Sequence, residues 1–247
     1  MSLYFEPVTI ENQNDYLKHF HKCSRKASDY SFVNIWGWAD EYGLELARDD
    51  NLIWIKQTRP ETVYWAPVGD WEIADWKKLL EAEFTGPSGF IRIPETLAHI
   101  WNNCTHKLID IEEARGHWDY LYLVKELVEL KGNRFHNKRN LFSQFIKSYN
   151  CEYILLGPEV IDKAISMQSE WCTWRDCEAI ETLSAENHVI EKVLKAWEKL
   201  YGIKGGALMA DGQIVAYTVA ESLTDDTLLI HFEKANQGYK GAYQAIN

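Results

Sequence analysis

The sequence predicts an α+β protein made of two tandem domains, each with a mixed, mostly antiparallel sheet flanked by helices. Two observations carry this prediction. The chain has 247 residues and is 46% hydrophobic, which suffices for one large domain or two of ordinary size with a buried core. One order of elements, namely a strand, two helices, three antiparallel strands and a helix, also occurs in both halves. Because such an order seldom repeats by chance, it indicates two copies of one architecture.

The first half contains one copy of this order. Alternating apolar and polar residues predict strands, and apolar residues at helical spacing predict helices. The expected strands are 4–10, 44–48, 52–57, 62–68 and 89–93, and the expected helices are 11–23, 31–42, 70–84 and one that Pro94 opens. Residues 49–51 separate two of these strands as a hairpin turn would. Asp70 is expected to cap the helix that follows it.

The second half contains the other copy. The expected strands are 151–157, two strands within 204–222, and 226–235, and the expected helices are 158–174, 185–202 and one from Gly238 onward. Asp211-Gly212 is the strongest hairpin signal of the chain. Pro158 should open the first of these helices and Ser184 should cap the second.

These elements predict domains over 1–116 and 151–247, joined by a connecting strand and a basic helix over 117–150. The second domain is expected to be incomplete at its C-terminal end. A sheet that stops at its fourth strand would leave an unpaired edge, so we expect the natural polypeptide to continue past Asn247.

Composition excludes several functional classes. The N-terminus has neither a basic start nor an apolar run, and no stretch of about 18 apolar residues occurs, so we expect a cytoplasmic protein without a membrane span. The five cysteines are scattered and form no CxxC pair, which predicts reduced thiols and no metal site. The net charge is -11, and without the five basic residues of 131–147 it is -16 (-11 minus 5). A protein whose whole surface binds nucleic acid or anionic membranes through positive charge is therefore excluded.

A basic segment stands out in this acidic chain. From Lys131 through Lys147 there are five basic side chains and no acidic one. In the expected helix 134–149, four apolar residues at helical spacing should face the core: Leu141, Phe142, Phe145 and Tyr149. Arg134 and Lys138, four residues apart, should lie on another face. The segment falls between the predicted domains, where ligand sites are common, and it is either a binding surface or a solvated helix face.

The repeated element order is similar to that of the GNAT (acyl-CoA N-acyltransferase) fold, so we expect two GNAT-like domains. Three stretches also resemble a bacterial family related to the C-terminal domain of phosphatidylglycerol lysyltransferases: SDYSFVNIWGW, DYLYLVKELVELKGNRFHNKRN and HFEKANQGYKGAYQAIN. The resemblance covers nearly the whole chain. It implies two GNAT-like domains, and the Fem peptidyltransferases have a similar paired fold.

The resemblance implies aminoacyl transfer, because characterised relatives take an amino acid from a charged tRNA and pass it to a lipid headgroup. Six residues match the basic motif and are expected to bind tRNA phosphates or an anionic acceptor: Lys131, Arg134, His136, Lys138, Arg139 and Asn140. Eight match the second motif: His231, Glu233, Lys234, Gly238, Tyr239, Gly241, Tyr243 and Asn247. The chain lacks a membrane domain and a polybasic surface, which puts a phosphatidylglycerol acceptor in doubt and leaves an amine or hydroxyl acceptor open.

An acyl-CoA-dependent N-acetyltransferase is the alternative enzyme. GNAT enzymes hold the pyrophosphate on backbone N–H groups of a glycine-rich loop at a helix N-terminus. NQGYKGAY offers Gly238, Lys240 and Gly241 for this, but the Gln or Arg that begins the pattern is absent and Tyr243 replaces its last small residue. Gly238 is otherwise an ordinary residue at a helix start. Aminoacyl-tRNA and acyl-CoA are thus the two candidate co-substrates.

Either transfer needs a base, an acid and donors for the tetrahedral oxyanion. His231 and Glu233 are two residues apart on one expected strand and should share a face, so Glu233, directly or through water, is the candidate base. Tyr239 or Tyr243 is the candidate acid. The alternative is that His231 and Glu233 are solvated or paired with Lys or Arg.

A third hypothesis is a non-catalytic binding module with the same fold. No strand of the first half shows an acid and a base together, so that half would fit such a role on its own. When Glu233 is neutralised, an enzyme should lose turnover and keep ligand affinity, whereas a module has no turnover to lose.

Overall fold

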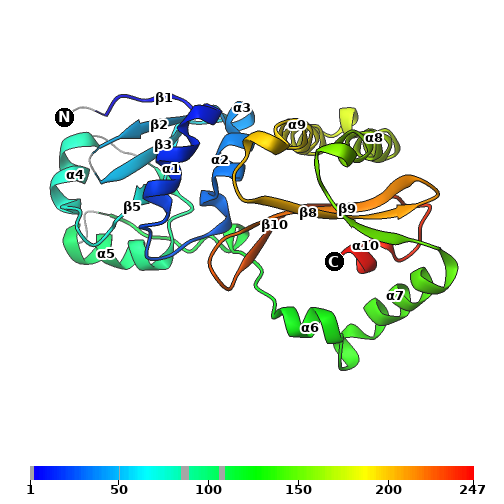
Figure 1. The fold of residues 1–247 in the computed structure, drawn as a ribbon. Coiled ribbons are helices and arrows are strands. Elements are labelled where there is room, and N and C mark those ends of the chain that lie inside the picture. The colour runs from blue at the N-terminus through cyan, green and yellow to red at the C-terminus, as the bar shows by residue number, and fades with distance from the viewer. Residues whose placement is uncertain (1–2, 50, 85–88, 106–108) are drawn as a thin grey trace. The chain divides into compact units, whose positions relative to one another are not determined.

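The computed structural model describes residues 3–49, 51–84, 89–105 and 109–247. The chain divides into two compact units, Met1–Asp119 and Tyr120–Asn247. Each unit has a sheet of its own together with helices, so the protein belongs to the mixed α+β class (Figure 1).

The first unit has a six-stranded sheet in the order β1-β2-β3-β4-β6, with β5 paired to β3. The strands are β1 Glu6–Pro7, β2 Leu44–Arg48, β3 Leu52–Gln57, β4 Val63–Trp65, β5 Val68–Gly69 and β6 Phe90–Ile91. All pairs are antiparallel except β4 with β6. The hairpin of β2 and β3 is confirmed, although residue 50 of its turn lies outside the described residues.

The α-helices among the described residues of this unit are α1 Gln13–Phe20, α2 Phe32–Gly37, α3 Ala39–Tyr42, α4 Trp76–Glu83 and α5 Glu95–Thr105. Short 3-10 helices lie at Ile10–Asn12, Ser28–Tyr30 and Arg115–His117. The core is rich in tryptophan. Trp76 is fully buried and packs edge to face against Trp54 at 6.2 Å and Trp101 at 5.5 Å between ring centroids. Each such pair adds roughly 0.5–1.5 kcal/mol to the stabilisation that burial alone gives.

Three expectations for the first unit need correction. The cap of α4 is Asp75, whose side chain accepts a hydrogen bond from the Lys78 N–H, whereas the Asp70 carboxylate accepts from Glu72 N–H in a turn before the helix. The strand expected at 62–68 is split, because Pro67 has no N–H to donate to a ladder. β1 has two residues where a strand over 4–10 was expected, because a 3-10 helix begins at Ile10.

The second unit has a four-stranded antiparallel sheet in the order β10-β9-β8-β7. Its strands are β7 Glu152–Leu155, β8 Ile203–Ala210, β9 Gln213–Ser222 and β10 Leu228–Ala235. The predicted hairpin turn is confirmed: Asp211 and Gly212 have φ of 51° and 76°, as a two-residue type I′ turn requires. Val215 and His231 are extra residues at two bulges, where the pairing register shifts by one.

Helices cover both faces of this second sheet (Figure 1). The helices of this unit are α6 Val124–Glu129, α7 His136–Ser148, α8 Pro158–Arg175, α9 Glu181–Lys195 and α10 Ala242–Ile246, with 3-10 helices at Asn133–Phe135, Cys177–Ala179 and Trp197–Lys199. Figure 1 shows α8 and α9 over one face, which we call the α8–α9 face, and α7 and α10 over the other, the α7–α10 face.

The α7–α10 face has a small hydrophobic core. Phe145 of α7 is 1% exposed and belongs to a buried cluster with Leu208, Ala216, Ala242 and other residues of β8 to β10 and α10. Phe142, which was expected to face the core, is 39% exposed. The buried cluster contacts only one side of α7. Phe142, three residues before Phe145, lies at the edge of that side, and its side chain stays at the surface.

Three sequence expectations for the second unit also differ from the structure. The connecting strand predicted within 117–150 is absent from the described residues there: 118–123 form no regular element, and α6 follows them. α9 begins at Glu181, so Ser184 lies inside the helix, with its N–H bonded to the Ile180 carbonyl. The helix expected to run to Gly202 already ends at Lys195 and is followed by the 3-10 helix.

The expectation of reduced thiols is wrong for two of the five cysteines. Cys172 and Cys177 form a disulfide with a Cα–Cα distance of 5.1 Å. Asp176 ends α8 in the left-handed conformation (φ 52°) and turns the chain back on the helix. That reversal brings Cys177 to Cys172, which the spacing of the two residues in the sequence does not indicate. Cys23, Cys104 and Cys151 are not disulfide-bonded.

Candidate functional site

Glu233 lies in β10, on the α7–α10 face, where Thr218 of β9 is its cross-strand partner. The Asn247 side-chain amide, which follows α10, donates to Glu233 Oε2 at 3.3 Å. Burial raises the pKa of the Glu233 carboxyl above its usual 4.5, while the Asn247 hydrogen bond and the positive charge of Lys138 oppose that rise. A carboxylate whose pKa is raised is a better general base than an ordinary surface glutamate.

Residues far apart in the sequence therefore converge on Glu233. Lys138 belongs to α7 and to the basic motif, whereas Glu233 and Asn247 belong to the second motif. The pairing of β10 with β9, and the packing of α7 and α10 on the same sheet face, bring the two motifs together. This convergence is the clearest chemical feature of the second unit.

His231 does not share a face with Glu233, contrary to expectation. It is the extra residue of the β10 bulge, so the side-chain alternation is shifted there. Its Nε2 lies 3.0 Å from Glu221 Oε1, and its side chain is fully buried. Glu221 lies on the α8–α9 face, the face of Tyr217 four residues earlier in β9. His231 is thus paired with Glu221 inside the protein.

Lys234 and Tyr243 also belong to a packed cluster. Lys234 Nζ is 2.8 Å from Glu186 Oε2 of α9 and 4.3 Å from the centre of the Trp171 ring. Trp171 Nε1–H donates to the Tyr243 hydroxyl at 3.2 Å. A buried ammonium needs such partners, so the contacts give Lys234 a structural role and hold Tyr243 against α8.

The loop before α10 is stabilised by internal hydrogen bonds. The N–H groups of Gly238, Tyr239, Lys240 and Ala242 donate to acceptors of the Asn236 side chain, the Asn236 carbonyl, the Tyr149 hydroxyl and the Tyr239 carbonyl. The Tyr239 ring also packs against Tyr149, 4.9 Å between centroids. A pyrophosphate would have to displace these bonds before it could use the loop.

Gly241 has a packing role in the same loop. Its φ is 92°, and a Cβ there would overlap the Leu141 carbonyl of α7. Only glycine combines this backbone conformation with so close an approach. The glycine therefore allows α10 to lie against α7, which requires no ligand.

The basic segment is partly neutralised by its own neighbours. Lys131 pairs with Glu129 at 3.0 Å, and Arg134 pairs with Glu126 and stacks on Phe135. These acidic residues lie in α6, just before the segment for which no acid was counted. Exposed ion pairs contribute only about 0–1 kcal/mol, so an anionic ligand can compete for both cations.

Arg139 is a structural member of the basic motif. It donates to the carbonyls of Leu130 and Gly132, the latter at 2.9 Å, and so ties the turn after α6 to α7. His136 and Asn140 are exposed and contact each other at 3.4 Å. Among the six motif residues, Lys138 is the one whose positive charge opposes the rise in the pKa of Glu233.

Sequence reasoning missed three residues beside Glu233. Thr218 pairs with Glu233 on one side and with Gly206 of β8 on the other, and the Tyr153 hydroxyl lies over Gly206. Among the described residues the buried Thr218 Oγ1 has no hydrogen-bond partner, which costs roughly 1–3 kcal/mol in a folded protein. The Gly205-Gly206 pair within a predicted strand was the available signal, because strand glycines mark close approaches.

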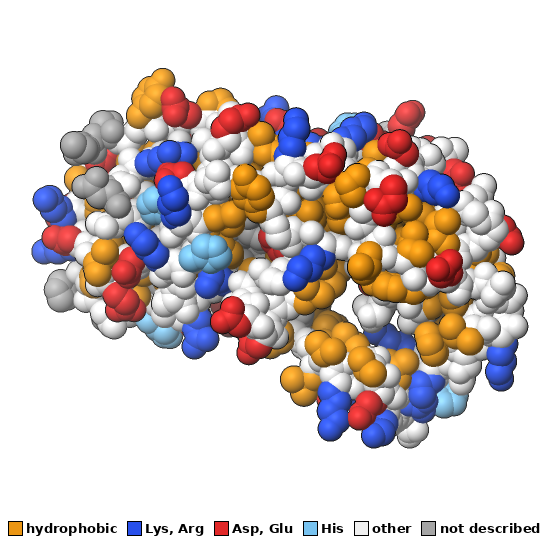
Figure 2. Space-filling view, viewed as in Figure 1, with side chains coloured by type: hydrophobic (Ala, Val, Ile, Leu, Met, Phe, Trp, Pro, Cys, Tyr) orange, Lys and Arg blue, Asp and Glu red, His pale blue; other side chains and the backbone are white. Residues whose placement is uncertain are grey.

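The surroundings of this face are apolar. Figure 2 shows hydrophobic side chains around a hollow of the second unit, between its sheet and the α6 and α7 helices. Large exposed hydrophobic residues occur on all these elements, including Val124, Val128, Phe142, Ile146, Tyr153, Leu155 and Ile230. Exposed apolar side chains gathered around a hollow are typical of a binding surface.

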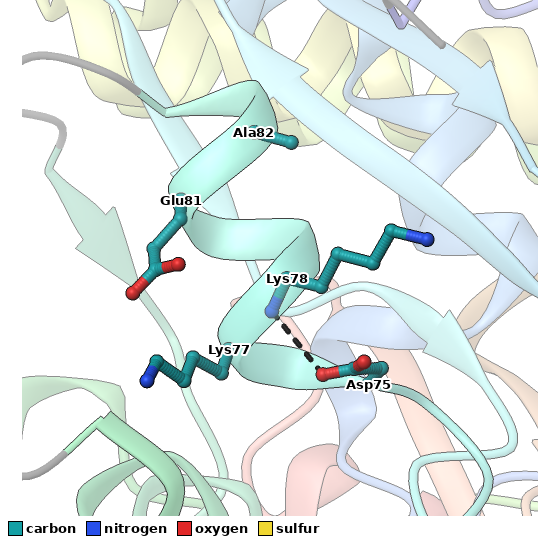
Figure 3. Close-up of a pocket in the computed structure, with 5 residues that line it drawn as sticks. All are labelled: Asp75, Lys77, Lys78, Glu81 and Ala82. Carbon is teal, nitrogen blue, oxygen red and sulfur yellow. Dashed lines mark hydrogen bonds between the residues drawn. The ribbon is translucent and has the colours of Figure 1, made fainter.

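Two further depressions lie in the first unit. Figure 3 shows a shallow pocket of about 380 Å³ on α4, lined by Asp75, Lys77, Lys78, Glu81 and Ala82. A groove of about 800 Å³ extends from α4 to β1 and the β2–β3 hairpin. None of the sequence-predicted site residues lines either depression. In the described parts of the chain, no three His, Cys, Asp or Glu side chains are grouped as metal ligands.

The comparisons with known proteins agree with the family suggested by the sequence. Residues 20–247 match the sequence model of the family described as "Phosphatidylglycerol lysyltransferase, C-terminal". No curated protein gave a match to this chain. None of the helices in the described ranges is both long and apolar enough to cross a membrane.

Two solved structures are similar over nearly the whole chain. A conserved protein of unknown function from Bacteroides thetaiotaomicron is 27% identical, with a TM-score of 0.86, and the match covers 99% of this chain and 84% of that one. The C-terminal domain of a proposed lysylphosphatidylglycerol synthetase from Agrobacterium fabrum is 12% identical, with a TM-score of 0.55, covering 96% of this chain and 71% of that one. The second likeness shows a shared fold.

Proposed function

Because this chain belongs to the phosphatidylglycerol lysyltransferase C-terminal family, we propose that it moves an aminoacyl group from a charged tRNA to a hydroxyl or amine acceptor. The observation that carries the proposal is the convergence on Glu233 of Asn247 from one motif and Lys138 from the other. We assign Glu233 as the general base of this transfer.

The reaction is an acyl exchange at an ester. The acceptor O–H or N–H gives its proton to the Glu233 carboxylate as its oxygen or nitrogen attacks the ester carbonyl. The bond from the carbonyl carbon to the tRNA ribose oxygen then breaks, and the ribose oxygen leaves with a proton. Asn247, by its hydrogen bond to Oε2, orients the carboxylate for this step.

The exposed part of the basic motif is the proposed tRNA contact. The side chains of Lys131 and Arg134 are 80% and 65% exposed. Their acidic partners, Glu129 and Glu126, are 33% and 38% exposed, so a ligand can reach both ion pairs. Phosphates of a nucleic acid outcompete such pairs at low salt, and the affinity falls as salt rises. A charged-tRNA donor would place the reaction in the cytoplasm.

The proposal extends to the fold. We assign each unit as GNAT-like, supported in the second unit by two consecutive helices, α8 and α9, between β7 and the β8–β9–β10 meander. This is the element order expected from the sequence. The likeness of fold alone does not choose the chemistry, so the choice of aminoacyl-tRNA as donor rests on the family.

The test uses the Glu233→Gln variant, which keeps the shape of the side chain and removes its basicity. Purified protein is given a mixed pool of radiolabelled aminoacyl-tRNA, with phosphatidylglycerol vesicles, glycerol or a short peptide amine as acceptors. We expect transfer to fall by about 10²–10⁴-fold in the variant, with unchanged tRNA affinity and a melting temperature no lower than that of the wild type. Glu198→Gln, at an exposed position of the same unit, is the matched control.

Two results would contradict the proposal. Transfer by Glu233→Gln at the wild-type rate would exclude Glu233 as the base. Binding of the tRNA pool by the wild type without transfer to any acceptor would favour a non-catalytic module. A parallel assay with acetyl-CoA identifies an acyl-CoA enzyme if that donor alone is used.

A further inference from the structure

Three functional groups form a row across adjacent strands on the α7–α10 face. Glu233 of β10 pairs with Thr218 of β9, and Thr218 pairs with Gly206 of β8. Gly206 has no side chain, and the Tyr153 hydroxyl occupies the place where its Cβ would be. The row therefore reads carboxylate, hydroxyl and phenol.

The spacing of this row follows from sheet geometry. Cross-strand partners on one face have Cβ atoms about 4.5–5.5 Å apart. The Thr218 side chain thus lies about 5 Å from the Tyr153 oxygen on one side and about 5 Å from the root of Glu233 on the other. A carbonyl group over Thr218 would have a carboxylate and a phenol on its two sides.

The state of the two hydroxyl groups points to a ligand. The Thr218 Oγ1 is buried, and within the described residues it has no hydrogen-bond partner. The Tyr153 side chain is 59% exposed, and it is the residue of the row that an incoming substrate meets first. Buried hydroxyls are normally paired, so one left open beside a candidate base indicates a substrate contact.

We propose that Thr218 donates to the oxyanion of the transfer reaction and that Tyr153 is the general acid for the leaving group. This assignment rests on the proposed function, in which Glu233 is the base. As the acceptor attacks, its proton moves to Glu233 and the carbonyl oxygen becomes an oxyanion that the Thr218 O–H stabilises. The bond to the ribose oxygen then breaks, and that oxygen takes the Tyr153 phenolic proton. Transfer of the proton from Glu233 through solvent to the phenolate restores both groups.

The structure favours Tyr153 over the two tyrosines expected from the sequence. The Tyr243 hydroxyl accepts from Trp171 of α8, and the Tyr239 ring packs on Tyr149. Tyr153 lies in the row with Glu233, because β7 pairs with β8 and Gly206 leaves room for the phenol.

The test compares two donors that differ in the need for an acid. One is the aminoacyl-tRNA pool, and the other is the 4-nitrophenyl ester of the same amino acid, whose leaving group departs without a proton. Tyr153→Phe should slow transfer from tRNA by about 10²–10⁴-fold and transfer from the nitrophenyl ester by less than about threefold. Tyr4→Phe, at an exposed tyrosine of the first unit, is the matched control.

Thr218 is tested on both donors, because each passes through the same oxyanion. Thr218→Val keeps the shape and removes the hydroxyl, so it should slow transfer from both donors by about 10²–10³-fold. Thr218→Ser keeps the hydroxyl and should transfer at a rate near that of the wild type. Circular dichroism melting confirms that the variants are folded.

The outcomes separate this assignment from the proposed function. Loss of activity in Glu233→Gln, with Tyr153→Phe and Thr218→Val near the wild-type rate on tRNA, overturns this assignment alone. If Tyr153→Phe slows transfer from both donors equally, Tyr153 is not the general acid. If the wild type transfers the aminoacyl group from neither donor, both the proposed function and this assignment are overturned.

Discussion

The polar side chains on the two faces of the second sheet differ in how closely they are paired. The α8–α9 face holds close pairs: His231 with Glu221, Lys234 with Glu186, and Tyr217 with Gln168. On the α7–α10 face, Glu233 has a longer bond from the Asn247 amide, and its neighbour Thr218 lacks a partner in the described structure. Close pairing marks groups that hold strands and helices together, whereas weak pairing around a carboxylate marks groups available to a substrate.

The largest effect is expected where the α7–α10 face is purely structural. Gly241→Ala should lower the free energy of unfolding by roughly 2–4 kcal/mol, because its φ of 92° and the overlap with the Leu141 carbonyl both oppose a side chain. Gly238→Ala is the control and should cost less than about 1 kcal/mol, since only Asn236 Oδ1 comes near at 3.3 Å. Urea unfolding of both variants measures this. Equal costs would remove the packing explanation for Gly241.

Coupling energies compare the two faces directly. A double-mutant cycle on His231 and Glu221, each changed to Ala, should give a coupling of about 1–2 kcal/mol, because the pair is buried. The same cycle on Glu233 and Asn247 should give less than about 0.5 kcal/mol, because that bond is long and exposed. A stronger coupling in the second pair would reverse the comparison.

The smallest effect is a pH dependence. The raised pKa of Glu233 means that the folded state holds this proton more tightly than the unfolded chain does. The stability that this contributes is present below about pH 4.5 and is lost as the pH rises through the folded-state pKa. Glu233→Gln stays neutral, so at pH 7 it should melt above the wild type, and the difference should shrink toward pH 4. A difference that grows toward pH 4 would contradict the raised pKa.

Much of the second sheet was predictable because its signals are local. Asp211-Gly212 gave the β8–β9 hairpin, and alternating residues gave β10. The bulges were not predictable. A two-residue turn alone pairs Thr218 with Gly205, and the extra residue Val215 moves that partner to Gly206. The same kind of shift at His231 separates it from Glu233, so both the missed row and the mistaken shared face come from one-residue changes of register.

The basic motif shows a different limit. Its cations were counted correctly, but the carboxylates that neutralise Lys131 and Arg134 lie in the preceding helix α6. Arg139 bonds to backbone carbonyls, which no pattern of side chains reveals. Sequence showed that charge is concentrated here, whereas the contacts show which of those charges are already used.

The central claim is that Glu233 serves chemistry and the opposite face serves structure, and a matched pair of glutamate-to-glutamine variants tests it. Glu233→Gln should lose about 10²–10⁴-fold in aminoacyl transfer and be at least as stable as the wild type. Glu186→Gln leaves the Lys234 ammonium, whose side chain is 9% exposed, without its carboxylate. It should lose about 1–3 kcal/mol of unfolding free energy and keep its turnover per folded molecule. Equal loss of turnover in both variants, or retained turnover in Glu233→Gln, would contradict the account.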